Sequence, residues 1–200
     1  SHGSYEEHLG RYNRVVKVRD ELKLPVATLF DSKGPEIRFR LFEGGKVTIN
    51  DGDLFTLTTK EVLGNNTIGS ISYKNLINDV QVGTSILVND GLIELKVEKI
   101  DDTDIVCRVI NGGVISDRKA INVPGVHLSL PFLSDVDRRD LEFAMETGFD
   151  FFALSFVRCA EDVLEVRRLQ KEHNNTSNLI AKIESQEGVE NLDAIINVAD

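Results

Sequence analysis

A lysine and a glutamate stand two residues apart in the segment 178–188, which begins with an apolar run and ends with small and polar residues. The run predicts a buried parallel strand, and the residues after it suit the start of a helix. Because alternate residues of a strand share a face, Lys182 and Glu184 are predicted to point toward one small volume. An ammonium there can stabilise phosphoryl charge, and a carboxylate can hold magnesium. A simple ion pair at a strand end fits the same spacing.

A second charged segment follows another apolar run. Residues 26–30 form a compact apolar stretch after Pro25 and predict a second buried parallel strand. Directly after it, residues 31–38 read D-S-K-G-P-E-I-R, with two acids and two bases around a glycine-proline turn. The carboxyl ends of parallel strands form the substrate site in β/α proteins, so this turn is a site candidate. A polar loop with internal ion pairs is the alternative.

Helices and strands must position these groups, and capping patterns with periodic apolar residues predict several of them. Ser4 with Glu7 forms a capping box before one helical pattern, and Ser134 begins another. A third apolar run, just before Arg158, predicts a third buried strand. The predicted elements are helices at 4–22, 134–148, 161–173 and from 188 onward, and strands at 26–30, at 150–156 and from 178 onward.

The segment between residues 39 and 122 has a different pattern, in which short β-prone runs alternate with turn residues such as the Asn-Asp-Gly at 89–91. This pattern predicts an all-β module, a small antiparallel barrel. Because a β/α pattern resumes afterwards, the module is predicted to be inserted after a strand and to act as a lid over the strand ends. Lys119, in its basic exit segment, can reach a phosphate on closure; a solvated linker lysine is the alternative.

The order of elements predicts the α/β class, as a partial (β/α)8 TIM barrel with an inserted all-β barrel-like lid domain. The predicted domains are residues 1–38 for the first part of the barrel, 39–122 for the lid and 123–200 for the second part of the barrel. Three barrel strands cannot close a barrel. The chain is therefore predicted to be a fragment of a longer protein or a piece whose sheet edges need a partner.

Composition narrows the class of protein. The 200 residues are 41% hydrophobic, enough for a sizeable core, and their formal net charge is -10. An acidic chain argues against nucleic acid as the main partner, because phosphate backbones attract basic surfaces. The sequence has no apolar run of the roughly 18 residues that a membrane span needs, so no membrane partner is predicted. Two distant cysteines predict a reducing, cytoplasmic location.

The charged motifs resemble those of the pyruvate kinase family, and they occur in that family's order along the whole chain. The pair formed by K-G-P-E-I-R at 33–38 and K-I-E-x-x-E-G at 182–188 is specific, and the β-rich insertion falls where the family has its lid domain. Further matching segments are S-H-G at 1–3, N-D-G at 89–91, R-K-A-I-N-V-P-G at 118–125 and S-F-V-R at 155–158.

The resemblance implies transfer of a phosphoryl group from phosphoenolpyruvate to ADP, which yields pyruvate and ATP. It assigns Lys182 to stabilising the transferred phosphoryl group. Glu184 matches a ligand of Mg²⁺ or Mn²⁺, and Phe156 matches a residue that packs beside the catalytic lysine. These roles are what the resemblance implies, and the spacing of the residues alone leaves the ion-pair alternative open.

The resemblance also implies a potassium site formed by Ser1, Asp31 and Ser32. In the family a glutamate at the position of Glu36 goes with dependence on K⁺, so potassium activation is predicted. Ser32 stands where the family usually has threonine, a mild change if the ligand is the backbone carbonyl. Substrate and nucleotide binding is predicted for His2, Lys33, Arg38 and Lys119.

The chain departs from the family pattern at its ends. Family residues that precede the S-H-G motif, and the segment with the second magnesium carboxylate, are absent from the 200 residues. Since one carboxylate holds Mg²⁺ poorly, the isolated chain is predicted to be inactive. The family precedent for the full-length protein is a homotetramer. Two alternatives remain: another phosphoenolpyruvate- or pyruvate-binding barrel enzyme, such as a metal-dependent aldolase, and a non-catalytic binding or structural fragment.

Overall fold

The structure, a computed structural model, describes residues 3–200 and divides into two compact units. The first contains the chain as far as Pro35 together with Pro131–Asp200, and the second is Glu36–Leu130. The second unit is longer than the predicted segment 39–122 for a physical reason. Arg38 lies in a strand that pairs within that unit, and Val126, Leu128 and Leu130 pack against its core.

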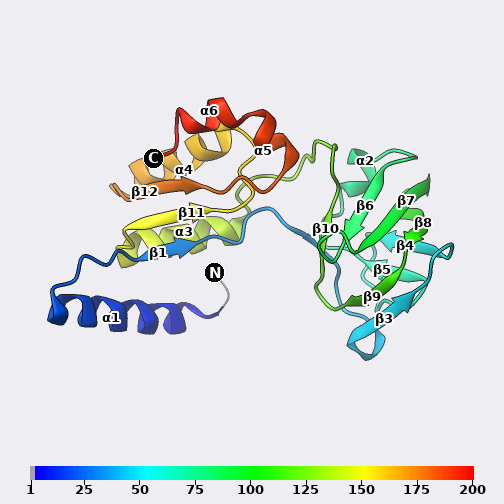
Figure 1. The fold of residues 1–200 in the computed structure, drawn as a ribbon, viewed down its shortest axis with the longest axis horizontal. Helices are drawn as coiled ribbons and strands as arrows, with labels where there is room; N and C mark the ends of the chain where they lie inside the picture. Colours follow the sequence, from blue (N-terminus) through cyan, green and yellow to red (C-terminus); the bar gives the residue numbers. More distant parts are fainter. Residues whose placement is uncertain (1–2) are drawn as a thin grey trace. The chain divides into compact units, whose positions relative to one another are not determined.

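The first unit contains a parallel three-stranded sheet within the described residues, in the order β1-β11-β12 (Figure 1). Phe30 is in register with Phe152, and Phe152 with Leu179. Consecutive parallel strands with helices between them follow the β/α order predicted from the sequence. The strands are Leu29–Asp31 (β1), Phe151–Leu154 (β11) and Asn178–Ala181 (β12).

Two helices of the first unit, α1 and α3, begin and end at the predicted signals. Ser4 and Glu7 form the capping box of α1, whose last residue is followed by a left-handed Lys23. Ser134 caps α3, and Gly148 ends it with a φ of 88°. The bounds are Tyr5–Leu22 (α1), Asp135–Thr147 (α3), Ala160–Glu172 (α4), Gln186–Glu190 (α5) and Leu192–Ile196 (α6).

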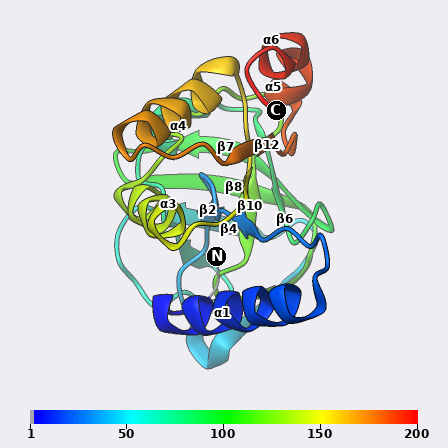
Figure 2. The ribbon, with the colours of Figure 1, turned by 90° about the vertical axis from the view of Figure 1, so that its left-hand side faces the viewer.

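One face of the sheet is covered by helices. Phe152 and Leu179 are fully buried and pack in one cluster with Leu141 of α3 and Val166 of α4. Burying a side chain of this size stabilises the fold by about 1.5–3 kcal/mol. Figure 2 shows α3 and α4 side by side. The alternate residues of each strand point to the opposite face of the sheet. The face on which a residue lies therefore decides whether its side chain is available at the strand ends.

The second unit is built on a seven-stranded sheet in the order β2-β10-β6-β7-β8-β4-β5. Its two edge strands are joined, because the Arg40 amide donates to the Ser70 carbonyl at 2.8 Å and the Ser72 amide donates to the Arg38 carbonyl at 2.9 Å. The sheet therefore closes on itself. All its neighbouring pairs are antiparallel except β4 with β5, which is parallel and was not expected.

The elements of the second unit follow one another closely along the chain. The strands of the closed sheet are Ile37–Arg38 (β2), Leu54–Thr58 (β4), Ile68–Ser70 (β5), Ser85–Val88 (β6), Ile93–Ile100 (β7), Asp104–Asn111 (β8) and Ala120–Asn122 (β10). A separate two-stranded sheet pairs β3 with β9. The remaining elements are Lys46–Ile49 (β3), Gly113–Ser116 (β9), the short helix Leu76–Asp79 (α2) and a 3-10 turn at Glu43–Gly45.

Four predicted elements have different bounds in the structure. The strand expected at 150–156 is Phe151–Leu154, because the chain leaves the extended conformation before Phe156, whose φ is 57°. The strand expected at 26–30 is Leu29–Asp31, because the chain after Pro25 makes a local turn in which the Val26 amide donates to the Leu24 carbonyl. The strand β12 ends at Ala181, so the prediction that Lys182 and Glu184 share a strand face was wrong. The helix predicted from 188 is two short helices. No described helix is long and apolar enough to cross a membrane.

Candidate functional site

The carboxyl ends of the three parallel strands carry the charged residues that the sequence singled out. Asp31 is the last residue of β1, and Lys182 follows the last residue of β12. The loops continue the strand register, because the Ser32 amide donates to the Ala153 carbonyl and the Lys182 amide donates to the Leu154 carbonyl, both at 2.9 Å. Side chains more than 100 residues apart in the sequence are thereby held at one edge of the sheet.

Lys182 lies between two carboxylates. Its Nζ is 2.8 Å from Asp31 Oδ1 and 3.7 Å from Glu184 Oε1, and 30% of the lysine side chain is exposed. Partial burial lowers the pKa of Lys182, but the hydrogen bond and charge of Asp31, followed by those of Glu184, outweigh this effect, and the net pKa is raised. Lys182 is therefore held as a cation. Because such half-exposed pairs stabilise a fold by only about 0–1 kcal/mol, stability alone does not account for the arrangement.

Glu184 is oriented by the loop after β11 rather than by a strand. Its Oε2 accepts a hydrogen bond from the Phe156 amide at 3.0 Å. Phe156 has a φ of 57°, a left-handed conformation that costs a residue with a side chain about 1–2 kcal/mol. The strained backbone turns the amide toward the carboxylate. Glu184 thus reaches the Lys182 side chain although it lies three residues beyond the end of β12.

Two buried serines join the loop after β1 to the loop after β11. The Ser155 amide donates to Ser32 Oγ at 3.0 Å, and Ser155 Oγ donates to the Ser32 carbonyl at 2.6 Å. Next to them Gly34 has a φ of 75°, and a Cβ on it would lie 2.7 Å from the Ser155 carbonyl oxygen. Only glycine fits this approach without displacement. The two loops therefore form one packed unit.

Lys33 takes part in a third contact at the end of β1. Its Nζ donates to Asp140 Oδ2 at 3.0 Å, and Tyr5 donates to the other oxygen of Asp140 at 2.8 Å. Only 10% of the Asp140 side chain is exposed. The sequence analysis missed Tyr5 and Asp140. The signal was present, because Asp140 falls on the apolar side of a helix with Leu141 and Ala144, where a carboxylate needs a partner.

Two further predicted site residues belong to the second unit and are described within it. Arg38 donates to Glu36 Oε2 from Nε at 2.8 Å and from Nη2 at 2.6 Å, and Nη1 donates to the Arg118 carbonyl at 2.8 Å. Lys119 follows Arg118, whose φ is 58°, and the Lys119 carbonyl accepts from the Phe39 amide. The remaining two predicted residues, Ser1 and His2, lie outside the described residues.

The oxygen atoms at the strand ends are of the type that hard cations prefer. Asp31 and Glu184 supply carboxylates, and the Ser32 carbonyl retains one lone pair after accepting from Ser155. Within residues 3–200 no three His, Cys, Asp or Glu side chains form a ready-made metal site. The donor set fits a cation that is shared with a bound phosphate, which is how Mg²⁺ is commonly held.

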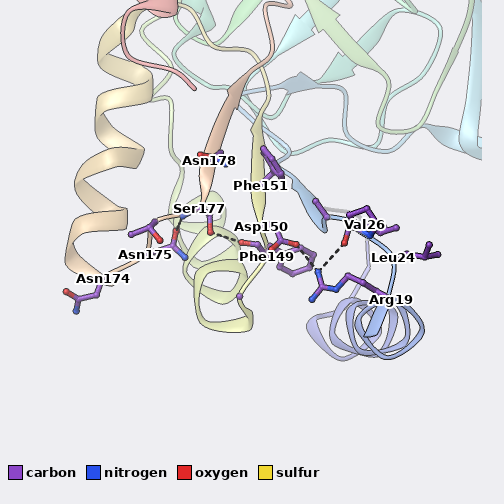
Figure 3. A pocket seen from close by; sticks show the side chains of 14 residues that line it. Arg19, Leu24, Val26, Phe149, Asp150, Phe151, Asn174, Asn175, Ser177 and Asn178 are labelled. Carbon is purple, nitrogen blue, oxygen red and sulfur yellow. Dashed lines mark hydrogen bonds and ion pairs between the residues drawn. The ribbon is translucent and has the colours of Figure 1, made fainter. Parts of the chain in front are cut away.

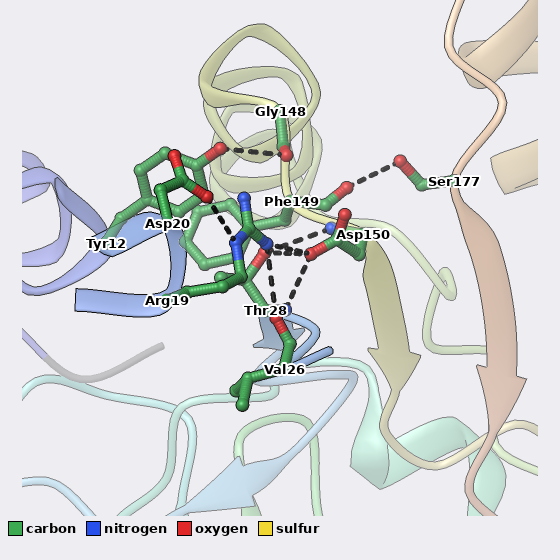
Figure 4. Close-up of polar contacts among 9 residues, drawn as sticks. All are labelled: Tyr12, Arg19, Asp20, Val26, Thr28, Gly148, Phe149, Asp150 and Ser177. Atoms are coloured by element: carbon green, nitrogen blue, oxygen red, sulfur yellow. Dashed lines mark hydrogen bonds and ion pairs between the residues drawn. The ribbon is translucent and has the colours of Figure 1, made fainter. Parts of the chain in front are cut away.

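The opposite ends of the same strands border an open hollow of about 830 Å³ (Figure 3). Its charged contacts are internal: Asp150 Oδ2 accepts from the Thr28 amide at 2.7 Å, from Thr28 Oγ1 at 2.8 Å and from Arg19 Nη1 at 3.2 Å (Figure 4). The Thr28 amide, more than the other contacts, lowers the pKa of Asp150. This network ties α1 to the starts of β1 and β11. Because the charges there are paired within the chain, they indicate a structural role, whereas the catalytic candidates lie at the carboxyl ends.

Comparison with known proteins gives consistent results. A family model for the pyruvate kinase barrel domain matches residues 1–200. A pyruvate kinase from Clostridium perfringens is 47% identical over 202 residues, covering 100% of this chain and 43% of the relative. A pyruvate kinase from Staphylococcus aureus (strain MRSA252) is 43% identical, covering 100% of this chain and 34% of that relative.

A solved structure is similar along the whole chain. The crystal structure of a pyruvate kinase from Cryptosporidium parvum matches with a TM-score of 0.89 and 36% sequence identity, covering 100% of this chain and 42% of that one. The chain therefore has a partial barrel fold, as the order of its elements predicted. It spans less than half the length of the relatives described.

Proposed function

Because this chain belongs to the pyruvate kinase family, we propose that it carries part of the active site of an enzyme that transfers a phosphoryl group from phosphoenolpyruvate to ADP. The observation that carries the proposal is the cluster of Asp31, Lys182 and Glu184 at the carboxyl ends of adjacent parallel strands. A cation held between two carboxylates at this edge suits a site for an anionic substrate and its metal ion.

Lys182 is the residue assigned to the chemical step. While the phosphoryl group passes from the enol oxygen of phosphoenolpyruvate to a terminal phosphate oxygen of ADP, its charge spreads over the equatorial oxygens. The ammonium of Lys182 stabilises that charge, and the raised pKa of Lys182 keeps the group protonated near neutral pH. The enolate left behind takes up a proton and becomes pyruvate. Phe156 orients Glu184 through its amide.

Two kinds of cation complete the proposed site. Glu184 would hold Mg²⁺ or Mn²⁺, and Asp31 with Ser32 would hold K⁺, for which Ser1 is a further predicted ligand. When bound, these cations offset the negative charge of the phosphates. The chain's own contribution is geometric, because Phe156 fixes Glu184 and Ser155 fixes the Ser32 carbonyl. Glu36, the residue from which potassium dependence is predicted, pairs with Arg38 at 2.6 Å.

Other parts of the proposal rest on the family match. We assign substrate or nucleotide binding to His2, Lys33, Arg38 and Lys119, and a lid function to the second unit. We also infer that the complete protein acts in the cytoplasm and forms a homotetramer. Because the chain covers only part of its relatives, the isolated 200 residues are expected to be inactive.

The test is the substitution Lys182→Met in the complete protein that contains this chain. Pyruvate formation from phosphoenolpyruvate and ADP should have kcat reduced by about 10²–10⁵-fold, the range seen when a cation that stabilises transition-state charge is removed. Lys17→Met is the matched control, since Lys17 forms only an exposed pair with Glu21 on α1. Activity of Lys182→Met within threefold of the control would contradict the proposal and favour a non-catalytic role.

The same assay separates the two enzyme classes. A phosphotransferase releases pyruvate only when ADP is supplied, and it forms ATP in equal amount. A metal-dependent aldolase acting on a related substrate would need Lys182 and Glu184 but not ADP. Pyruvate release that does not depend on ADP would therefore exclude the kinase assignment while leaving the strand-end site intact.

A further inference from the structure

The last residue of β1 and the turn that follows it are held at each of the residues 31–34. Asp31 pairs with Lys182, Ser32 exchanges two hydrogen bonds with Ser155, and Gly34 packs against the Ser155 backbone. The side chain of Lys33 makes the remaining contact, which runs to Asp140 on α3. It is the one described side-chain contact that ties this turn to a helix rather than to a neighbouring loop.

Asp140 is placed to bind two donors at once. Its two oxygens accept from Lys33 and Tyr5 at 3.0 and 2.8 Å, and only 10% of its side chain is exposed. A carboxylate this deeply buried is costly without such partners. The Tyr5 ring is itself fixed, because it stacks on Phe143 of α3 with centroids 4.5 Å apart and planes 9° apart. Tyr5, Asp140 and Lys33 therefore form a clamp, named here the Lys33 clamp.

We propose that Tyr5 and Asp140 are positioning residues that fix Lys33, and through it the carbonyl of Ser32 and the carboxylate of Asp31, in the geometry that binds a potassium ion. This inference rests on the proposed function, in which Asp31 and Ser32 belong to a potassium site. It adds two residues, from α1 and α3, that do not touch the ion or the substrate.

The physical reason is the number of oxygens that a monovalent cation needs together. A small outward movement of the turn would shift the Ser32 carbonyl and Asp31 at the same time, because they are adjacent in the chain. Lys33 directly follows the residues that supply these oxygens, so freeing its side chain removes the contact that ties this part of the turn to α3. Removing the clamp should weaken cation binding more than it slows the chemical step.

The test compares variants of the complete protein in two assays. Asp140→Asn and Lys33→Met each remove the charged contact, and Tyr5→Phe removes one hydroxyl. Glu165→Gln is the control, since it breaks a pair of similar length between Arg138 of α3 and α4, without touching the turn. One assay measures the K⁺ concentration that gives half-maximal pyruvate formation, and kcat at saturating K⁺. The other measures the shift in Tm when KCl replaces tetramethylammonium chloride at equal ionic strength.

We expect Asp140→Asn and Lys33→Met to raise the half-saturating K⁺ concentration by about tenfold, the scale of lost support behind a metal ligand. In Asp140→Asn, which leaves the proposed substrate-binding residues in place, kcat at saturating K⁺ should stay within twofold. Tyr5→Phe should raise it about threefold, as for one net hydrogen bond. The double variant Asp140→Asn with Lys33→Met should be no worse than either single variant, because both remove one contact. The potassium-dependent Tm shift should shrink in the same order, and Glu165→Gln should match the unmodified protein.

Several results would overturn the inference. These are a half-saturating K⁺ concentration within twofold of the control for both charge-removing variants, a loss confined to kcat in Asp140→Asn, or single effects that multiply in the double variant. If the unmodified protein shows no potassium-dependent Tm shift, the clamp has no cation to position and the inference fails. The Tm assay needs no turnover, so it decides the clamp even if phosphotransfer is absent and the proposed function fails. Should Asp140→Asn not fold, Tyr5→Phe and Lys33→Met decide.

Discussion

Replacing Gly34 by alanine tests how the loops at the strand ends are assembled. Gly34 has a φ of 75°, and the added Cβ would lie 2.7 Å from the Ser155 carbonyl oxygen, 2.9 Å from Ser155 Cβ and 3.1 Å from Phe156 Cδ2. The left-handed backbone costs alanine about 1–2 kcal/mol. Contacts this short against a packed backbone add about 1–3 kcal/mol. The opening free energy of the turn should fall by about 2–5 kcal/mol.

Gly52→Ala is the matched control for Gly34→Ala. Gly52 has a similar φ of 82°, but nothing lies within 4 Å of its built Cβ. The free energy required to open the turn at Gly52 should therefore fall by only about 1–2 kcal/mol, the cost of the left-handed backbone. The difference between the two variants is therefore the steric part, and it isolates the contact with Ser155 and Phe156 from the conformational preference of glycine.

Amide hydrogen exchange in the complete protein measures both effects, because it reports local opening. Peptides covering residues 31–34 and 155–157 should exchange faster in Gly34→Ala, by tenfold for each 1.4 kcal/mol or so of lost opening free energy. The Phe156 amide, which donates to Glu184, should be among the affected groups because the added Cβ would lie 3.1 Å from Phe156 Cδ2. Two results would refute the reasoning that the two loops pack as one unit. One is a loss of opening free energy at the Gly34 turn no larger than the loss at the Gly52 turn in Gly52→Ala, and the other is unchanged amide exchange of residues 155–157 in Gly34→Ala.

Two further predictions follow from single carboxylates. Asp150→Asn should speed exchange of the Thr28 amide by several-fold. This corresponds to a loss of about 1 kcal/mol of opening free energy, because solvent screens the charge of the partly exposed Asp150. The Thr28 amide lowers the pKa of Asp150 below its ordinary 3.8. The stabilisation that the Asp150 carboxylate gives the fold is therefore complete above pH 3.8 and is lost as the pH falls through the lower pKa of the folded protein. Equal exchange of the Thr28 amide at pH 6 in Asp150→Asn and in the unmodified protein would contradict this prediction. Glu184→Gln keeps an acceptor for Phe156 but loses the charge, so the Mg²⁺ concentration for half-maximal activity should rise by about tenfold or more; an unchanged requirement would remove Glu184 from the metal site.

The sequence was most informative where one signal acts locally. The capping boxes at Ser4 and Ser134 and the glycine at Gly148 predicted helix ends that the structure reproduces to within one residue. The order of strands and helices predicted the parallel sheet for the same reason, since each β/α unit is specified by its own apolar pattern.

The position of Glu184 could not be predicted, because it depends on residues distant in the sequence. Strand periodicity would place Lys182 and Glu184 on one face, but β12 ends at Ala181. The two side chains come together because a left-handed Phe156, from another loop, donates its amide to Glu184. A non-glycine residue with positive φ has no sequence signature, so the correct proximity was inferred from an incorrect cause.

Asp140 shows a different limit of sequence reasoning. Its place on the apolar side of α3 indicates that some buried donor must exist, but not which one. The donors, Lys33 and Tyr5, are more than 100 residues away, and they reach α3 only through the packing of α1 and the turn after β1. Burial of a charge therefore points to a partner without identifying it, and the identity comes from the fold.

The strand order explains why the loop after β11 has a central place in the site. Because β11 lies between β1 and β12, its loop can contact both neighbours, and those neighbours do not pair with each other. Ser155 bonds Ser32 on one side, and Phe156 bonds Glu184 on the other. The proposed potassium and magnesium ligands are thus oriented by two consecutive residues. A displacement of this dipeptide must move both sets of oxygens, so the responses to the two cations should change together, whereas a displacement of either outer loop should change only one.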